Sequence, residues 1–310
     1  MDLAKNLQLL EVWGDPVSPQ EPESFGWFDV SQGRAPAHGS WERPLEVSKA
    51  ASLVQFAGTS HFHVLTEVFG RLWLLRDVLK QEDVRVVVPK LKGFLSKGFK
   101  ILTKGLEIKQ NRFIEWTGGP SDVMLRLETL YYANWLVPMA LGQDGGHCPT
   151  PASILRGVRS ALTSGSSKDT TEKPAFVFIK RKGEMRSVLK GEKKLVEGLQ
   201  ELAASHGMDF VTFESLKPSD TLQLFARARV VLGVHGAGLT NLLFCTDALV
   251  FELGFASPFA GHYRYLSKAL GLRLSSLSLR SDARGMAARE VEIDLETTLR
   301  AVRMRLREEL

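Results

Sequence analysis

The stretch Val230–Phe244, VVLGVHGAGLTNLLF, decides the fold class of this chain. Its first residues are apolar and mostly β-branched, which predicts a buried strand. A glycine-rich turn follows, and the apolar run after it predicts a helix. Gly236 and Gly238 lack a Cβ, so the backbone there can approach a ligand closely. Free N–H groups and the positive dipole end at a helix start favour a bound phosphate.

Strands and helices alternate on both sides of this stretch. Strands are predicted at 175–180, 208–213, 229–234 and 248–253, and helices at 191–207, 219–228 and 261–270, with a further helix beginning in the turn itself. Four strands, each followed by a helix, predict a parallel, Rossmann-like sheet. A last helix is expected within 281–310, with Asp294 as its N-cap.

The first half of the chain also has an α/β pattern. A strand is predicted at 52–58, a helix at 61–80, a strand at 84–90, a basic amphipathic stretch at 91–106 and a helix at 152–162. Residues 1–50 are interpreted as an irregular lead-in. The polar run Thr163–Pro174 is the predicted domain boundary. The expected domains are therefore 51–165 and 166–280.

Composition excludes several classes of protein. The chain has 310 residues, of which 44% are hydrophobic and 24% charged, which is typical of a globular protein of about two domains. Its apolar runs are shorter than the ~20 residues of a membrane span, and its N-terminus shows no secretory leader. Cys148 and Cys245 exclude a disulfide framework and leave a single bridge open.

The net charge of +5 is concentrated in one segment. Lys168–Lys194 holds nine basic and four acidic residues, so the rest of the chain sums to about zero. A local basic stretch beside a strand favours one anionic ligand over a long nucleic-acid footprint. A solvated linker face is the alternative. We expect no nucleic-acid partner, because no basic–aromatic stacking motif accompanies the charge.

The candidate binding residues follow the predicted strands, because ligands of parallel sheets bind beyond the carboxyl ends of the strands. Arg181 and Arg186 are candidates for binding phosphate; the alternative is that both are solvated surface cations. Glu252 is a candidate for accepting hydrogen bonds from a ribose; the alternative is that it caps a helix or is a surface charge. The candidate donor loop consists of His235, Gly236, Ala237, Gly238, Leu239, Thr240 and Asn241.

These segments carry a resemblance to a known family. FVFIKRKGEMR, VVLGVHGAGLTNLLF and VFELGF resemble the "I-x-R…R" strand end, the "G-x-HGAGLTN" loop and the "E-L" strand of glycosyltransferase family 61. SHFHVLTEVFG is similar to the family's N-terminal helix, where His63 and Glu67 take the places of a histidine and an acid. The resemblance covers about residues 50–275. Lys190-Gly191 stand where the family usually has an Asn-Glu pair.

The resemblance implies a GT-B architecture of two Rossmann-like domains facing across a cleft, with a nucleotide sugar bound to the C-terminal one. It implies inversion at the anomeric carbon, which requires one general base. Glu67 is the expected base with His63 as its partner, and the reverse assignment stays open. No Asp-x-Asp motif is present, so we expect no metal and no cofactor, and we disfavour reading His61, His63 and Glu67 as metal ligands.

The expected substrates are a UDP-sugar donor and a glycan or glycoprotein acceptor. The family also implies residence in the secretory pathway, in the Golgi or ER lumen; without a visible anchor, the chain is expected to be a truncated form. The alternative is a noncatalytic nucleotide- or sugar-binding protein derived from such an enzyme.

Overall fold

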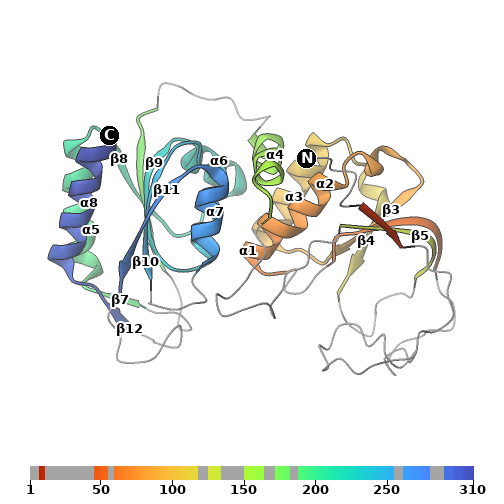
Figure 1. Cartoon of the computed structure of the whole chain (residues 1–310), viewed down its shortest axis with the longest axis horizontal. Coiled ribbons are helices and arrows are strands. Elements are labelled where there is room, and N and C mark those ends of the chain that lie inside the picture. Colours follow the sequence, from red (N-terminus) through yellow and green to blue (C-terminus); the bar gives the residue numbers. More distant parts are fainter. Residues whose placement is uncertain are drawn as a thin grey trace. The chain divides into compact units, whose positions relative to one another are not determined.

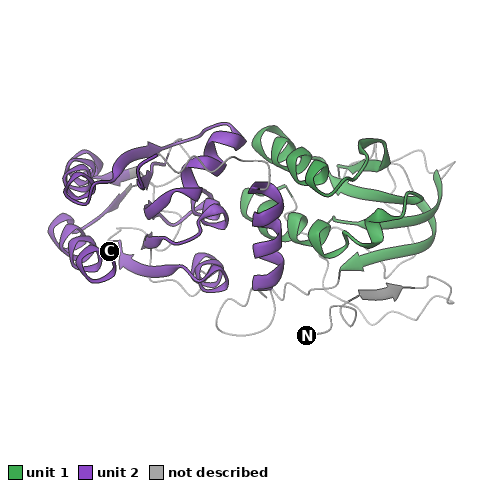
Figure 2. Cartoon of the chain, turned by 90° about the horizontal axis from the view of Figure 1, so that it is seen from above, with its two compact units in different colours: residues 1–135 green, residues 136–310 purple. Residues whose placement is uncertain are grey.

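The structure, a computed structural model, describes residues 7–10, 45–54, 59–117, 125–133, 150–163, 172–181, 188–254, 261–279 and 290–310. The chain forms two compact units, Met1–Trp135 and Leu136–Leu310, which we call unit 1 and unit 2 (Figure 2). Each unit contains a mainly or wholly parallel sheet with helices, so the predicted α/β class is confirmed.

Unit 1 is built on a five-stranded sheet of order β1-β5-β2-β3-β4. Its strands are β1 (Leu7–Leu10), β2 (Leu45–Ser52), β3 (Val84–Pro89), β4 (Phe113–Trp116) and β5 (Leu125–Ala133). All neighbours pair in parallel except β1, which is antiparallel to β5. The strand predicted at 84–90 is confirmed. The strand predicted at 52–58 is wrong in its bounds, because β2 ends at Ser52, and residues 55–58 lie outside the described residues.

The interpretation of residues 1–50 as an irregular lead-in is wrong for two segments, Leu7–Leu10 and 45–50, which are strands. The start of β2, LEVSK, alternates apolar and polar residues and is exposed or partly exposed, so it lacks the continuous apolar run of a buried strand. Cross-strand side-chain pairs stabilise it instead. Ser48 Oγ donates to Glu128 at 2.7 Å, and Arg126 Nη1 donates to Glu46 at 3.0 Å.

The helical part of unit 1 begins where it was predicted but is divided. The segments are α1 (His61–His63), the π-helical turn η2 (Val64–Val68), α2 (Phe69–Leu74), the 3-10 turns η3 (Val78–Lys80) and η4 (Gln110–Arg112), and α3 (Gly93–Gly105). The N–H of Phe69 donates to the carbonyl of Val64, five residues back, which defines the π turn. All five residues of η2 are buried. Phe99 of α3 packs on Phe69 at a ring distance of 6.0 Å.

Unit 2 is a three-layer α/β/α unit. Its parallel sheet has the order β11-β10-β9-β6-β8, and α5 and α8 cover one face while α6 and α7 cover the other (Figure 1). The strands are β6 (Ala175–Ile179), β8 (Asp209–Phe213), β9 (Ala228–Val234), β10 (Leu249–Gly254) and β11 (Arg273–Ser278). The helices are α5 (Glu192–Ser205), α6 (Pro218–Ala226), α7 (His262–Leu270) and α8 (Leu295–Glu309). The four predicted strands are confirmed, and β11 adds a fifth.

The last helix belongs to unit 2. Its N-cap is Asp294, as predicted, whose carboxylate accepts a hydrogen bond from the N–H of Thr297 at 2.9 Å. Val302 and Leu306 of α8 join a core with Leu195 and Leu199 of α5. Before α8, β12 (Glu290–Glu292) pairs in parallel with β7 (Val188–Lys190), a pairing that the sequence did not indicate.

The division between the units lies earlier in the chain than the expected boundary at 165/166. Helix α4 (Ala152–Thr163) was expected in the first domain but belongs to unit 2, where it packs on α7. Arg159 of α4 donates to the carbonyl of Cys245 at 2.6 Å. The polar run Thr163–Pro174 therefore marks a connection inside unit 2. Among the described helices, none combines the length and apolar character that crossing a membrane requires.

Candidate functional site

The donor loop lies at the point of unit 2 where the strand order reverses. The chain enters the sheet at β6, adds β8 on one side, and then places β9 on the other side. In open α/β sheets ligands bind at the carboxyl ends of the strands beside such a switch point. Arg181 lies two residues after the end of β6, and His235 follows β9 directly. The sheet order therefore brings the two strongest predicted binding residues to the same edge.

Arg181 contacts the loop itself. Its Nη2 donates to the carbonyl of His235. The preceding residue, Lys180, is paired with Glu192 at 3.2 Å and with Glu214 at 3.8 Å. The other predicted arginine, Arg186, lies outside the described residues.

Both glycines of the loop lie close to side chains at or just after the end of the neighbouring strand β6. A Cβ on Gly236 would lie 3.1 Å from Cζ of Arg181, and a Cβ on Gly238 would lie 2.7 Å from Cγ2 of Ile179. The backbone of Gly236 is extended, so its φ angle alone would admit any residue. The segment that follows, η5 (Ala237–Phe244), is a 3-10 helix and not the predicted α-helix. It comprises Ala237, Gly238, Leu239, Thr240 and Asn241 of the predicted loop and the apolar residues after them.

His235 and Glu252 form a buried pair. Nδ1 of His235 lies 2.6 Å from Oε1 of Glu252, and their side chains are 12% and 4% exposed. The N–H of His235 donates to the carbonyl of Leu253 at 2.7 Å, and the ring of Tyr263 lies 5.1 Å away. A carboxylate accepts hydrogen bonds, so Nδ1 carries the proton and Nε2 is the second functional atom of the ring. Glu252 thus holds the histidine, a role that the sequence did not indicate.

Two buried polar atoms of the loop have no hydrogen-bond partner within the ranges that the structure describes. Asn241 Nδ2 donates to the carbonyl of Gly238 at 2.9 Å, but Asn241 Oδ1 has no partner among the described residues. The same holds for Oγ1 of Thr240. These residues are 3% and 0% exposed. Buried polar groups are nearly always satisfied, and exceptions occur where a ligand completes the site.

The candidate base in unit 1 is a second histidine–carboxylate pair. Nδ1 of His63 lies 2.9 Å from Oε1 of Glu67, so the predicted neighbours at i and i+4 do meet. The His63 side chain is 17% exposed and that of Glu67 is 6% exposed. Oε2 of Glu67 is buried with no hydrogen-bond partner in the described part of the chain. Glu67 lies in the π turn η2, and such turns are frequent at functional sites.

Sequence reasoning did not single out two further residues of unit 1, Arg71 and Tyr132. Arg71 follows Glu67 by four positions and is buried, with 2% exposure. Its Cζ lies 5.9 Å from the ring centre of Tyr132 on β5. Burial lowers the pKa of the Arg71 guanidinium, and the interactions with Tyr132 and Glu67 act in the opposite direction. The spacing from Glu67 was a usable signal for Arg71, whereas nothing local pointed to Tyr132.

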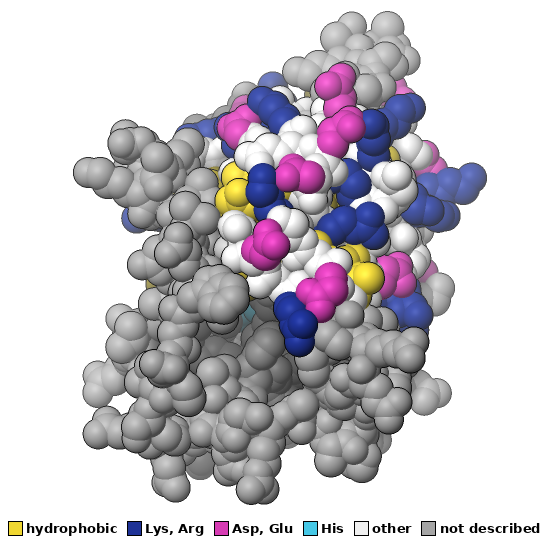
Figure 3. Space-filling model, turned by 90° about the vertical axis from the view of Figure 1, so that its right-hand side faces the viewer, with side chains coloured by type: hydrophobic (Ala, Val, Ile, Leu, Met, Phe, Trp, Pro, Cys, Tyr) yellow, Lys and Arg dark blue, Asp and Glu magenta, His cyan; other side chains and the backbone are white. Residues whose placement is uncertain are grey.

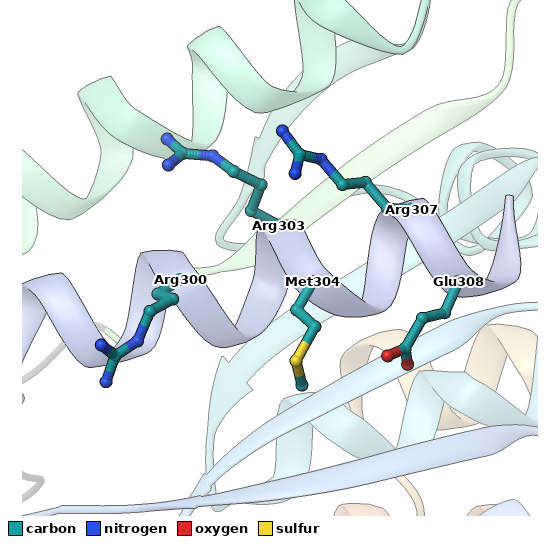
Figure 4. Close-up of a pocket in the computed structure, with 5 residues that line it drawn as sticks. All are labelled: Arg300, Arg303, Met304, Arg307 and Glu308. Atoms are coloured by element: carbon teal, nitrogen blue, oxygen red, sulfur yellow. The ribbon is translucent and has the colours of Figure 1, made fainter.

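Other features of the described residues do not suggest a different active site. They contain no cluster of three or more His, Cys, Asp or Glu side chains that could hold a metal ion. A hollow on the surface of α8 holds none of the predicted site residues; it is lined by Arg300, Arg303, Met304, Arg307 and Glu308 (Figure 4). On the face of unit 1 in Figure 3, basic and acidic side chains are interspersed. Some basic and acidic side chains of this unit form ion pairs; for example, Nζ of Lys49 lies 2.8 Å from Oδ2 of Asp83.

Rossmann-like units with a polar cluster at the switch point are typical of enzymes that bind nucleotides. The family described as Glycosyltransferase 61 matches residues 61–251, and this chain belongs to glycosyltransferase family 61. The matched range holds both His63–Glu67 and the donor loop, and it ends one residue before Glu252.

No curated protein sequence is similar to this chain at a significant level. A solved structure that it resembles is the crystal structure of the dodecameric iron-containing heptosyltransferase TibC in complex with ADP-D-beta-D-heptose. The TM-score is 0.34 at 10% sequence identity, over 70% of this chain. The chain spans 61% of the length of that protein.

Proposed function

We propose that the protein is an inverting glycosyltransferase of the GT-B type. It transfers a sugar from a nucleotide sugar, a UDP-sugar, to a hydroxyl group of a glycan or glycoprotein. The observation that carries this proposal is the polar cluster at the switch point of unit 2. There Arg181 and the His235–Glu252 pair meet a loop in which Thr240 and Asn241 have buried atoms without a hydrogen-bond partner among the described residues.

The donor site of unit 2 stabilises the leaving group in this proposal. As the bond between the sugar and the diphosphate breaks, negative charge grows on the diphosphate oxygens. Arg181 supplies a fixed positive charge, and His235 supplies a hydrogen bond or a positive charge through Nε2. Fixed charges and dipoles of this kind stabilise a transition state because they need no reorganisation. They can take the place of a divalent cation, so we propose that transfer needs no metal.

The base of unit 1 removes the proton of the acceptor hydroxyl. The acceptor oxygen attacks the anomeric carbon from the side opposite the diphosphate, and the bonding pair leaves with the nucleoside diphosphate. The geometry favours His63 as the base, the reverse of the assignment that the sequence favoured. Glu67 is the more deeply buried of the two side chains, and its Oε1 already contacts Nδ1 of His63. In the proposed mechanism the proton of the acceptor therefore goes to Nε2 of His63.

A noncatalytic binding protein is the second candidate function. The observation that favours it is at Lys190-Gly191, where the chain departs from the family pattern. Gly191 adopts a left-handed conformation, with a φ of 78°, at the start of α5. Glycine adopts this conformation without strain, so the backbone at position 191 favours the glycine of this chain over the Glu of the family pattern. For either function, we propose residence in the secretory pathway on the basis of the family.

A transfer assay separates the two candidates. The purified chain is incubated with a panel of UDP-sugars and acceptors, with and without EDTA, and release of UDP and formation of product are measured. We expect turnover that EDTA leaves unchanged, and product of inverted anomeric configuration by NMR. Binding of UDP without turnover would favour the noncatalytic protein. His235→Ala should abolish UDP binding, and His206→Ala, which changes an exposed histidine after α5, is the matched control.

A further inference from the structure

Helix α7 and the strand β11 line a hollow of about 470 Å³, which we call the α7–β11 hollow. It contains none of the residues that the proposed function uses. Its lining residues are Arg264, Ser267 and Lys268 of α7, Leu272 in the turn that follows, and Leu274 and Ser276 of β11. β11 is the edge strand of its sheet, and α7 packs beside it (Figure 1). A hollow of this volume is large enough for a small organic ligand.

Two cations lie on the side of α7 that lines the α7–β11 hollow. Arg264 and Lys268 are four positions apart, so the helix places their side chains next to each other. Both are exposed, and neither forms an ion pair with another residue that the structure describes. No acidic side chain is among the described residues that line the hollow. Two adjacent cations without a counter-charge favour an anionic ligand.

A buried hydroxyl group also lines the α7–β11 hollow. Ser267 is 1% exposed, and its Oγ has no hydrogen-bond partner in the described part of the chain. A serine inside a helix often donates to the carbonyl four residues before it, and Ser267 does not. Since buried polar groups are nearly always satisfied, this hydroxyl points to a ligand that completes the site. It lies three positions after Arg264 and therefore on the same face of α7.

The opposite wall is the outer edge of β11. The N–H of Arg273 donates to the carbonyl of Ala248 at 3.3 Å, next to β10. Alternate residues of a strand direct their backbone groups to opposite sides, so those of Leu274 and Ser276 point away from β10. No described strand pairs with β11 on that side. Ser276 is exposed and is the register partner of Glu252, so this wall lies one strand away from the donor site.

We propose that the α7–β11 hollow binds an anionic sugar residue of the acceptor glycan, one that carries a carboxylate, phosphate or sulfate group. The inference rests on the proposed function, in which a glycan is the acceptor. Arg264 and Lys268 bind the anionic group. Ser267 and Ser276 form hydrogen bonds with sugar hydroxyls, and the apolar face of the ring packs on the two leucines. An acidic peptide paired along β11 is disfavoured, because it would need only the strand edge and would leave the buried hydroxyl of Ser267 unused.

The first experiment titrates the chain with glucuronic acid, a glucose phosphate and a glucose sulfate, with and without saturating UDP, and follows binding by NMR. We expect at least one of the three to bind equally in both conditions. Neutral glucose and inorganic phosphate should each bind about tenfold more weakly, since each lacks part of the contacts. Loss of binding when UDP is added would place the anion in the donor site and overturn the proposal. So would binding of none of the three, inorganic phosphate binding as tightly as the sugars, or binding of a hexaglutamate peptide in their place.

The second experiment repeats the titration with variants. Lys268→Met and Arg264→Met should weaken binding about three- to tenfold, and Ser267→Ala about two- to tenfold. Ser267→Ala should not lower the melting temperature, because it removes a buried hydroxyl without a described partner. Lys194→Met is the matched control, because Lys194 is an exposed lysine on α5. Wild-type affinity in Lys268→Met or in Ser267→Ala, or an equal loss in Lys194→Met, overturns the proposal.

The transfer assay keeps this inference separate from the proposed function. A chain that binds the anionic sugar through these residues but transfers no sugar would refute the proposed function and still confirm the α7–β11 hollow as a binding site. A chain that transfers sugar but binds none of the anionic sugars would refute the inference alone.

Discussion

Replacing Gly236 with alanine tests whether Arg181 and the donor loop act as one site. The extended backbone of Gly236 accepts alanine without strain, so the effect of the new Cβ is confined to its neighbours. The Cβ would lie 3.1 Å from Cζ of Arg181 and closer still to Nη2. The guanidinium must therefore move away and give up its hydrogen bond to the carbonyl of His235.

The expected loss is the contribution of one hydrogen bond from a charged group. That contribution is about 1.5–3 kcal/mol, which corresponds to a roughly ten- to hundredfold weaker Kd for UDP. The fold should be little affected, because the displaced atoms are the flexible end of a long side chain at the surface edge of the sheet. Isothermal titration calorimetry with UDP and a thermal melt measure the two quantities on the same sample.

Gly238→Ala is the matched control in the same loop. Its Cβ would lie 2.7 Å from Cγ2 of Ile179, a branched side chain that is 5% exposed and cannot swing away. Overpacking of this kind costs about 1–3 kcal/mol of stability. Wild-type UDP affinity in Gly236→Ala would refute the reasoning. So would a fall in its melting temperature as large as that of Gly238→Ala, since the two glycines would then serve packing alike.

Three further predictions follow from the described contacts. Arg181→Ala should weaken UDP binding about ten- to hundredfold by calorimetry, whereas Arg229→Ala, whose arginine pairs with Asp247, should not; equal affinities would remove Arg181 from the donor site. Glu67→Gln should leave UDP affinity unchanged and lower kcat about 10²–10⁴-fold, with an equal or larger loss in His63→Ala; a kcat like that of the wild type in His63→Ala would exclude His63 as the base. Burial raises the pKa of the Cys245 thiol to about 12, so in a Cys148→Ser background a thiol reagent at pH 8 should label Cys245 only after denaturation. Complete labelling of the native protein within minutes would show that the reagent reaches Cys245 in the folded state and would contradict its burial.

The sequence alone was sufficient for four of the five strands in the main sheet of unit 2 and for the position of the donor loop. Strands β6, β8, β9 and β10 are short segments rich in apolar and β-branched residues with breaks on both sides, and such local patterns predict a strand whatever its partners. Asp294 was recognisable as a cap because the contact that it makes lies three residues away. The spacing of His63 and Glu67 likewise predicted their contact, since a helix brings i and i+4 together.

Only the tertiary structure determined how these pieces combine. The contact of Arg181 with His235 spans 54 positions, and that of His235 with Glu252 spans 17. Both depend on the strand order of the sheet, which is a property of the whole unit and leaves no periodic signal in the sequence. The burial of Arg71 against Tyr132 depends in the same way on how its helical segment packs on β5. Local patterns specify which elements form, but the free energy of packing distant segments decides which of their side chains become a site.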